Sequence, residues 1–211
     1  MKKTEKLRYI LDTLTNYYPE ALCSLEYMKP WQLLFAVRMA AQCTDARVNL
    51  VTPVLYARYP TLEEMAAANV EDVAEIIHST GFFRAKARDI VATANLLLQR
   101  HGGLVPDTME ELLALPGVGR KTANLILGDV YNKPGVVIVD THCLRISARL
   151  GLTDGTKEPA KAEVQLRKIL PPEKSNDFCH RLVLFGRDIC TARSPKCNDC
   201  KLLSVCQHPQ G

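Results

Sequence analysis

Four cysteines close together in the last part of the chain are the side chains best suited to hold a metal. Cys190, Cys197, Cys200 and Cys206 follow the spacing C-x6-C-x2-C-x5-C. Structural zinc sites usually have two cysteine knuckles separated by a longer loop, whereas only one knuckle, Cys197 to Cys200, is present here. One loop with four unevenly spaced cysteines favours a [4Fe–4S] cluster, in which each of the four irons binds one thiolate. Zinc and unmetallated thiols are the alternatives.

The other four cysteines are not predicted to bind a metal or to take part in catalysis. We expect Cys23, Cys43, Cys143 and Cys179 to be small buried hydrophobic residues. In the loop between the first two proposed ligands, Arg193 and Lys196 are expected to point outward, where they could bind phosphate. Two solvated charges without a partner are the alternative for this pair.

A glycine-rich turn lies in the segment LLALPGVGRKTANLIL at 112–127. Gly117 and Gly119 flank Val118, and glycines permit a tight turn with positive φ. Such a turn leaves backbone N–H groups bare at the start of the next helix, where they and the helix dipole attract an anion. This is a helix–hairpin–helix pattern, which predicts binding to a DNA phosphate; a helical corner without a ligand is the alternative.

Lys121 and Asp140 are candidate catalytic residues. Lys121 lies in the first turn after the hairpin, where the helix dipole favours the neutral amine that a nucleophile needs. An unperturbed lysine is almost fully protonated at neutral pH, so burial or a proton acceptor would have to lower its pKa further. Asp140 stands at the predicted N-cap of the following helix. The residue pattern alone does not pair them, and a surface lysine and a capping aspartate are the alternatives.

Apolar residues recur at the spacing of an amphipathic helix along almost the whole chain, including the segments that contain these candidate residues. The sequence predicts helices over residues 7–18, 30–41, 46–59, 70–80, 83–101, 119–131, 141–150, 164–170 and 178–189, and a short one after the capping pair Thr108 and Glu111. The one β-like run, Val136–Val139, has no partner strand and is interpreted as an extended connection. The predicted fold class is all-α.

Composition is that of an ordinary globular protein. The 211 residues are 47% hydrophobic and 24% charged, which argues against disorder, and the net charge of +4 is compatible with a polyanionic partner. No apolar run approaches the roughly 18 residues that span a bilayer. The basic residues at the start of the chain are not followed by the apolar segment of a signal peptide. We therefore expect no membrane association, a cytoplasmic location (with the nucleoid, if the source is bacterial) and a monomer.

Together these motifs resemble the endonuclease III family of helix–hairpin–helix DNA glycosylases. The resemblance covers nearly the whole chain: AAQCTD at 40–45, LPGVGRKTAN at 115–124, VDTHCLR at 139–145, FGRDIC at 185–190 and the cysteine tail. It implies two helical lobes. One is a six-helix barrel over 23–135 that contains the hairpin, and the other combines 1–22 with 136–211, the cluster loop region being 186–211.

The resemblance also implies an activity. Members of the family excise oxidised or fragmented pyrimidines from damaged double-stranded DNA after flipping the base out of the stack. By this resemblance Lys121 attacks C1′ and forms a Schiff base, and β-elimination then cuts the strand 3′ to the lesion. Asp140 either helps to deprotonate Lys121 or stabilises positive charge on the sugar; both roles are open.

Further DNA contacts follow from the resemblance. Gln42 should fill the gap left by the flipped base, and Phe82 occupies a position where the family often has an aliphatic wedge. Ala40 replaces a common serine beside the lesion pocket, so the lesion spectrum is open. His142 and Arg145 lie in a matching motif with roles that are not assigned.

Several other functions compete with this one. Related glycosylases act on G·T mismatches or pyrimidine dimers, and a non-catalytic DNA-binding module or a ferredoxin-like electron carrier would come from other classes. Adenine glycosylases usually lack a lysine at the position of Lys121 and carry an extra C-terminal domain, which we do not expect here. The combination of Lys121 with Asp140 favours an enzyme, a DNA glycosylase with AP lyase activity.

Overall fold

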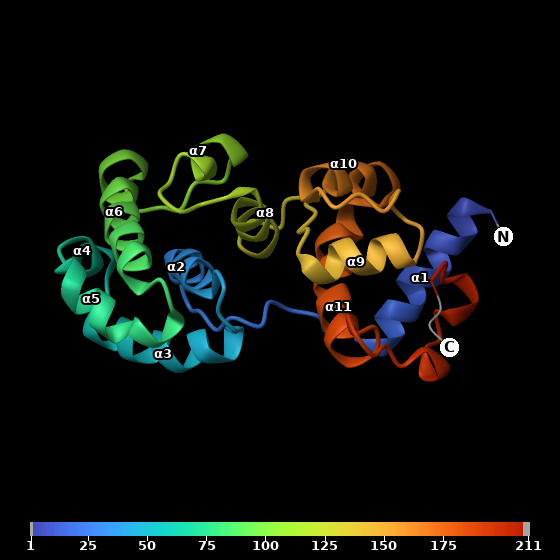
Figure 1. The fold of residues 1–211 in the computed structure, drawn as a ribbon. Helices are drawn as coiled ribbons and strands as arrows, with labels where there is room; N and C mark the ends of the chain where they lie inside the picture. The colour runs from blue at the N-terminus through green and yellow to red at the C-terminus, as the bar shows by residue number, and fades with distance from the viewer. Residues whose placement is uncertain (1, 209–211) are drawn as a thin grey trace. The chain divides into compact units, whose positions relative to one another are not determined.

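The computed structural model describes residues 2–208, which pack as two compact units. One unit is Cys23–Tyr131, and the other joins the described parts of residues 1–22 and 132–211 (Figure 1). None of the described residues forms a β-strand, so the prediction of an all-α fold is confirmed, and Val136–Val139 runs as an extended connection. Within residues 2–208 no helix has the length and apolar character needed to cross a membrane.

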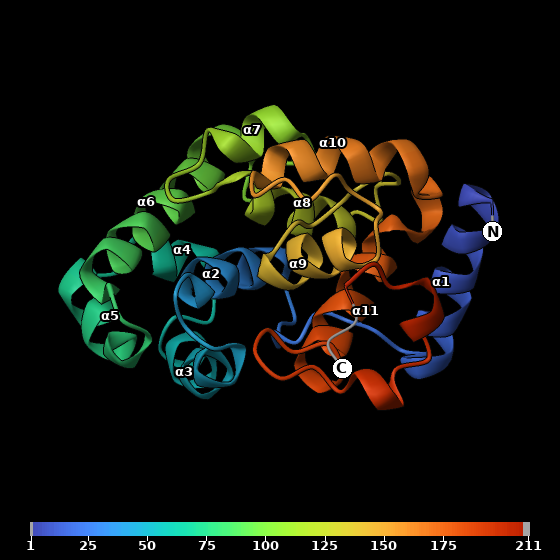
Figure 2. The same ribbon diagram turned by 45° about the vertical axis from the view of Figure 1, so that its right-hand side comes forward.

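In the unit Cys23–Tyr131, α6 is the longest helix and packs against α2, α4 and α5 (Figure 2). Helix α8 packs against α2 and α7. The helices are α2 (Pro30–Ala40), α3 (Asp45–Arg58), α4 (Leu62–Ala66), α5 (Val70–Ile76), α6 (Phe83–His101), α7 (Met109–Leu113) and α8 (Arg120–Asp129), with a 3₁₀ turn η1 (His78–Thr80). The core is formed mainly by the apolar faces of α2, α6 and α8.

Local sequence explains most of the helix boundaries. Thr44, Thr61, Asn69 and Thr108 each accept a hydrogen bond from a backbone N–H in the first turn that follows. Helix α6 ends at Gly102, whose φ of 58° is the left-handed conformation that terminates many helices. The start and end of α6 are therefore those predicted from the sequence.

The second unit is built around α11 (Ser175–Asp188), which packs against α1 (Lys3–Tyr17) and α9 (Thr141–Arg149). Its remaining elements are α10 (Pro159–Ile169) and the 3₁₀ turns η2 (Pro172–Lys174), η3 (Cys197–Asp199) and η4 (Leu203–Val205). Phe178, Leu182 and Phe185 of α11 are buried in the core. Gly186 of α11 lies so close to His142 of α9 that a Cβ at this position would overlap the imidazole.

Two helix predictions need correction, and one helix was not predicted. The expected helix over 70–80 is divided, because α5 stops at Ile76 and the chain tightens into η1 before Gly81, which has φ of 70°. Helix α10 begins at Pro159 rather than near Val164, since proline is well suited to a first helical position. Helix α4 was not predicted, although Thr61 and Glu64 form a capping box before it.

The four cysteines outside the tail are only partly as predicted. Cys143 and Cys179 are buried, and the Ile138 N–H donates a hydrogen bond to Cys179 Sγ at 3.2 Å. Cys23 and Cys43 are only half-buried because they lie in the connections that precede α2 and α3 rather than within a core stripe. Burial nevertheless raises the pKa of the Cys23 thiol to about 12, so it stays protonated at neutral pH.

Candidate functional site

The glycine turn forms a tight connection between α7 and α8. Gly117 has φ of 71°, and the Val118 N–H donates to the Leu115 carbonyl at 3.2 Å. Gly119 is the N-cap residue of α8, and having no side chain it gives no side-chain cap to the first turn. The first N–H groups of α8 are thus presented beside a glycine at the surface, which is the arrangement that binds an anion.

Lys121 is the second residue of α8 and its side chain is exposed. The residues that follow it, Ala123 to Gly128, are buried, so the helix is anchored in its unit while its first turn faces outward. The fold therefore places a primary amine directly beside the backbone anion site. An exposed lysine in this position is accessible to a ligand that binds at the turn.

Asp140 caps α9, as predicted. Its Oδ1 accepts a hydrogen bond from the Cys143 N–H at 2.7 Å, and the residue is half-buried after the buried run Val136–Val139. This bond orients the carboxylate, since the cap fixes one oxygen and leaves Oδ2 for other partners. Lys121 and Asp140 belong to different units, and their pairing stays a prediction.

His142 and Arg145 lie one turn further along α9. Burial lowers the pKa of His142 below its usual 6.5; Asp140 opposes this shift, and Arg145 and Arg187 add to it. Arg145 approaches the His142 ring nitrogen Nδ1 at 3.2 Å and donates to the Cys190 carbonyl at 2.9 Å. Arg145 thus links the helix that carries Asp140 to the first cysteine of the tail.

Gln42 and Phe82 have the same unusual backbone conformation. Gln42 has φ of 56° and Phe82 has φ of 48°, both in the left-handed region that residues other than glycine seldom adopt. Gln42 follows α2, and Phe82 is the N-cap residue of α6. Both side chains are exposed, with 69% of Phe82 accessible, which is unusual for an aromatic residue and leaves it free to contact a partner.

The four cysteines of the tail line one pocket. Cys190, Cys197, Cys200 and Cys206 are half-buried thiols around an apolar cavity whose other walls include Ile146, Leu150, Phe185 and Leu202. Burial, together with the neighbouring thiols, raises the pKa of Cys200. No group of three or more His, Cys, Asp or Glu side chains within residues 2–208 has the arrangement of a single-metal site.

Arg149 of α9 organises the loop that carries these thiols. Its guanidinium donates to Cys190 Sγ at 3.2 Å and to the Thr191 carbonyl at 2.9 Å, and its own carbonyl accepts from the Gln207 N–H at 2.8 Å. The loop also closes on itself, because the Lys196 N–H donates to the Ile189 carbonyl at 2.9 Å. Arg149 therefore holds the first of the four thiols and the loop that follows it against α9.

The two predicted phosphate contacts of this loop differ. Arg193 and Lys196 are both exposed, but Lys196 Nζ lies 3.4 Å from Asp188 Oδ1 in an exposed ion pair. Exposed ion pairs of this kind contribute little and are readily exchanged for another anion. Both residues therefore remain candidates for phosphate contact.

Comparison with known proteins places this arrangement in a family. Residues 35–172 match the HhH-GPD superfamily of base excision DNA repair proteins. The chain is 44% identical to endonuclease III of Synechocystis sp. over 208 residues, with 99% of this chain and 94% of the relative covered. It is 38% identical to endonuclease III of Escherichia coli (strain K12) over 210 residues, with 100% and 98% covered. The chain belongs to the endonuclease III family.

Solved structures of the endonuclease III family match the whole fold. A trapped endonuclease III–DNA covalent intermediate has a TM-score of 0.91 and 40% identity, with 98% of this chain and 97% of that chain covered. A thermostable thymine-DNA glycosylase, at 22% identity and a TM-score of 0.83, shares the fold. The predicted family, the helix–hairpin–helix glycosylase fold and the assignment as a base excision repair DNA glycosylase and AP lyase are confirmed.

Two side chains of this endonuclease III family member were not identified from the sequence. Arg149 is one, because a basic residue in the last turn of a helix usually indicates only a favourable dipole interaction. Lys86 is the other; it lies on the buried face of α6 and is fully buried. The signal that would have found it is a lysine within an otherwise apolar helical stripe.

Proposed function

We propose that the protein removes oxidised pyrimidines from damaged double-stranded DNA and cuts the strand 3′ to the lesion, with Lys121 as the nucleophile. The observation that carries this proposal is the exposed Lys121 in the first turn of α8, directly after the glycine turn. A solved relative that is 40% identical forms a trapped covalent intermediate with DNA. A covalent intermediate needs a protein nucleophile, and an amine next to a phosphate-binding turn lies beside the bound strand.

In the first step the neutral amine of Lys121 attacks C1′ of the damaged nucleotide. A bond forms between Nζ and C1′, and the bond from C1′ to the base breaks. The base leaves with the electron pair of that bond and takes up a proton. Opening of the sugar ring then gives a protonated Schiff base between Lys121 and C1′.

In the second step the Schiff base acts as an electron sink. Loss of a proton from C2′ sends its electron pair toward C1′, and the bond from C3′ to its phosphate oxygen breaks. The strand is thereby cut 3′ to the lesion, and water hydrolyses the Schiff base to release Lys121. Each step needs only an amine and a group that accepts or offsets charge.

We assign the charge-handling role to Asp140. Its Oδ1 is held by the Cys143 N–H, so the carboxylate is oriented before substrate binds. Oδ2 is the atom that would accept a proton from Lys121 or offset positive charge that develops on the sugar. The half-buried position strengthens either interaction, because charges interact more strongly away from bulk water.

Binding to the duplex would use backbone contacts and two inserted side chains. The turn at Gly117 and Gly119 offers N–H groups to one phosphate, and Arg193 and Lys196 offer charges to others. Gln42 and Phe82 would enter the stack where the damaged base has left, since both are exposed at the tips of turns. Phe82 would stack on a neighbouring base, which an aliphatic wedge does not do.

The pocket of the tail fits a [4Fe–4S] cluster held by Cys190, Cys197, Cys200 and Cys206. Four thiols line one apolar pocket, and Arg149 donates to one of the four sulfurs. When bound, the cluster would supply structural cross-linking of the loop rather than a step of the reaction. Arg193 and Lys196 would then be held in place for contact with DNA. Iron, zinc and acid-labile sulfide analysis of the purified protein separates this assignment from zinc.

We further propose that the protein acts as a monomer in the cytoplasm, at the nucleoid in a bacterial cell. The partner is damaged duplex DNA, and no membrane is involved. The superfamily match to base excision DNA repair proteins supports this location.

A lesion panel tests the proposed function. Duplexes that carry one thymine glycol, one G·T mismatch or one pyrimidine dimer are incubated with the protein, and base release and strand cleavage are followed separately. The proposal predicts that only thymine glycol is released and that the cut lies 3′ to it. Release of thymine from the mismatch alone, or cleavage at the dimer alone, would assign the chain to a related glycosylase. Binding without base release on every substrate would indicate a DNA-binding module.

A further inference from the structure

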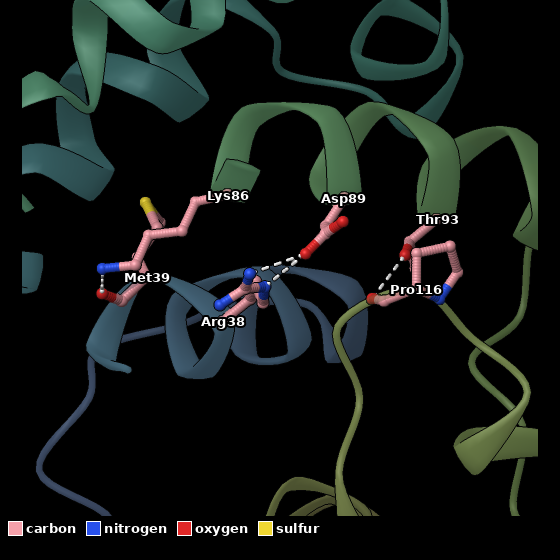
Figure 3. Close-up of polar contacts among 6 residues, drawn as sticks. All are labelled: Arg38, Met39, Lys86, Asp89, Thr93 and Pro116. Atoms are coloured by element: carbon pink, nitrogen blue, oxygen red, sulfur yellow. Dashed lines mark hydrogen bonds and ion pairs between the residues drawn. The ribbon is translucent and has the colours of Figure 1, made fainter. Parts of the chain in front are cut away.

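Lys86 is a fully buried lysine in the middle of the unit Cys23–Tyr131. Its ammonium donates to the Met39 carbonyl at 2.7 Å and to the Thr80 carbonyl at 2.8 Å (Figure 3 shows the first of these bonds). Burial lowers the pKa of Lys86, as expected where an ammonium is taken out of water. A buried cation is costly, so its retention within an apolar stripe indicates a role other than packing.

Both accepting carbonyls lie just before the residues proposed to enter DNA. Met39 is in the last turn of α2, and Gln42 follows it in the connection to α3. Thr80 ends η1, and Phe82 follows after Gly81. Among the described residues the non-glycine positions with positive φ are Gln42, Phe82 and Asn132, so the two turns bridged by Lys86 contain two of the three.

This backbone conformation needs support from outside the turn. A left-handed residue other than glycine is disfavoured by its own Cβ and persists only where the surroundings hold it. Gln42 and Phe82 have exposed side chains, so packing of those side chains does not hold them. The Lys86 ammonium, fixed in a rigid helix, supplies a bond to each of the two turns.

The same face of α6 also holds the glycine turn. Asp89 accepts from Arg38 Nε at 2.7 Å (Figure 3). This ion pair lies against Gly117, where an added Cβ would overlap both side chains. Thr93 Oγ1 lies at 3.4 Å from the Pro116 carbonyl. Lys86, Asp89 and Thr93 are spaced three and four residues apart and so share one face of α6. That face forms a common frame for three turns that carry proposed DNA contacts.

We propose that Lys86 is a positioning residue, whose ammonium ties together the turns of Gln42 and Phe82 and fixes the spacing at which the two side chains enter duplex DNA. This inference deepens the proposed function and rests on the roles assigned there to Gln42 and Phe82. Lys86 is fully buried and so does not touch the substrate itself. Its effect should appear only where both side chains must fill a stacked duplex.

The test compares double-stranded with single-stranded substrate. Lys86→Met keeps an unbranched side chain only one atom shorter than lysine and removes the charge and all donors. On a duplex with an abasic site opposite 2-aminopurine, we expect single-turnover strand cleavage to fall by about 10- to 100-fold, because small misplacement of positioning groups has effects of this size. The fluorescence change of 2-aminopurine, which reports its unstacking, should be lost in parallel. On a single-stranded abasic oligonucleotide the rate should stay within a factor of about two, since no stack is entered.

Three controls separate positioning from loss of structure. Arg88→Met removes an exposed positive charge from the same helix and should leave both rates unchanged. Lys86→Met added to Gln42→Ala/Phe82→Ala should cause little further loss on the duplex, because the groups it positions are already gone. If Lys86→Met does not fold, Lys86→Gln removes the charge but keeps an N–H donor in the side chain, and the single-stranded rate reports the folded fraction.

The outcomes distinguish this inference from the proposed function. Equal losses of Lys86→Met on duplex and single strand, or a full further loss in the Gln42→Ala/Phe82→Ala background, would overturn the positioning role. Unchanged duplex cleavage and 2-aminopurine fluorescence would overturn it as well. A wild type that cleaves abasic sites but releases no oxidised pyrimidine would contradict the proposed substrate instead, and the comparison of abasic substrates would still decide the role of Lys86.

Discussion

Asp140 has a structural role and a proposed chemical role. One carboxylate oxygen serves the structural role, and the other is proposed to serve the chemical one. Oδ1 caps α9 through the Cys143 N–H, while the proposed chemistry needs the negative charge. A substitution that keeps the acceptor and removes the charge therefore separates the roles. Asparagine does this, since it is as good an N-cap residue as aspartate.

Asp140→Asn should keep the stability and lose the activity. We expect the free energy of unfolding to change by less than about 0.5 kcal/mol and base excision to fall by roughly 100-fold or more. Asp140→Ala should also lose about 1 kcal/mol of stability with the cap. Thr108→Ala, which removes the cap of α7, is the matched control that loses stability without chemistry. Full excision activity of Asp140→Asn, with stability intact, would rule out a catalytic carboxylate here.

His142 makes the stability of its unit depend on pH. Its pKa in the folded protein lies below the usual 6.5, chiefly because of burial. As the pH falls below about 6.5, the unfolded chain takes up this proton before the folded chain does, so stability declines until the folded pKa is passed. Chemical denaturation between pH 8 and pH 5 should show this loss, and His142→Gln should reduce the slope. A slope that is unchanged in the variant would place the titration elsewhere.

At the scale of elements, the two glycines of the hairpin have different roles. Gly117 has φ of 71° and abuts Arg38 and Asp89, whereas Gly119 has φ of −98° with open space around it. Gly117 is thus required by the fold, and Gly119 is required only if something approaches its backbone from outside.

Gly117→Ala and Gly119→Ala form a matched pair that tests this division. Gly117→Ala should lower the free energy of unfolding by about 1–3 kcal/mol, because it combines an unfavourable φ with overlap. Gly119→Ala should change it by less than about 0.5 kcal/mol, yet weaken duplex binding, since the new methyl group stands where a phosphate would approach. Thermal or denaturant unfolding and a DNA titration on both variants give the answer. Unaltered DNA affinity of Gly119→Ala would argue against phosphate binding at this turn.

Local signals explain why some elements were predictable and others were not. Helix α6 has the predicted bounds, and its end was predictable because Gly102 and Gly103 follow it. The division between α5 and η1 was not predicted, because the apolar helical period continues across it; Thr80 at the end of η1 accepts a hydrogen bond from Lys86 of α6. The start of α10 was missed because the apolar period begins only after Pro159.

Some residues of the candidate site could likewise be predicted from local sequence, and others could not. The glycine turn, Lys121, the Asp140 cap and the cysteine tail have short spacings that the sequence shows directly. Lys86 acts through a carbonyl 47 residues away, and Arg149 acts through a carbonyl 42 residues away. Such contacts are set by packing between helices. A lysine within an apolar stripe indicates that Lys86 is buried, but no local pattern predicts that it contacts the Met39 carbonyl.

At the scale of the whole molecule, each compact unit supplies one proposed catalytic group. Lys121 comes from the unit Cys23–Tyr131, and Asp140 comes from the unit that also holds the cysteine tail. Arg145 and Arg149 link α9, which begins next to Asp140, to the loop after Cys190. Changes in the tail should therefore affect DNA binding and the stability of its unit together.

Cys197→Ser should show this coupling. We expect loss of the iron–sulfur absorbance, lower stability and weaker binding to damaged duplex, because the loop of Arg193 would no longer be cross-linked. Cys23→Ser, in the other unit and outside the tail, should keep the colour and the affinity. A colourless Cys197→Ser protein with normal stability and affinity would contradict a structural role for the cluster.

Lys121 is the proposed covalent nucleophile, and borohydride trapping tests this role directly. Wild type and Lys121→Gln are each incubated with a duplex that carries one thymine glycol, borohydride is added, and the adduct is digested and mapped by mass spectrometry. We predict a covalent protein–DNA adduct for the wild type, attached at Lys121, and none for Lys121→Gln. An adduct that maps to another residue, or equal trapping of the variant, would contradict the assignment.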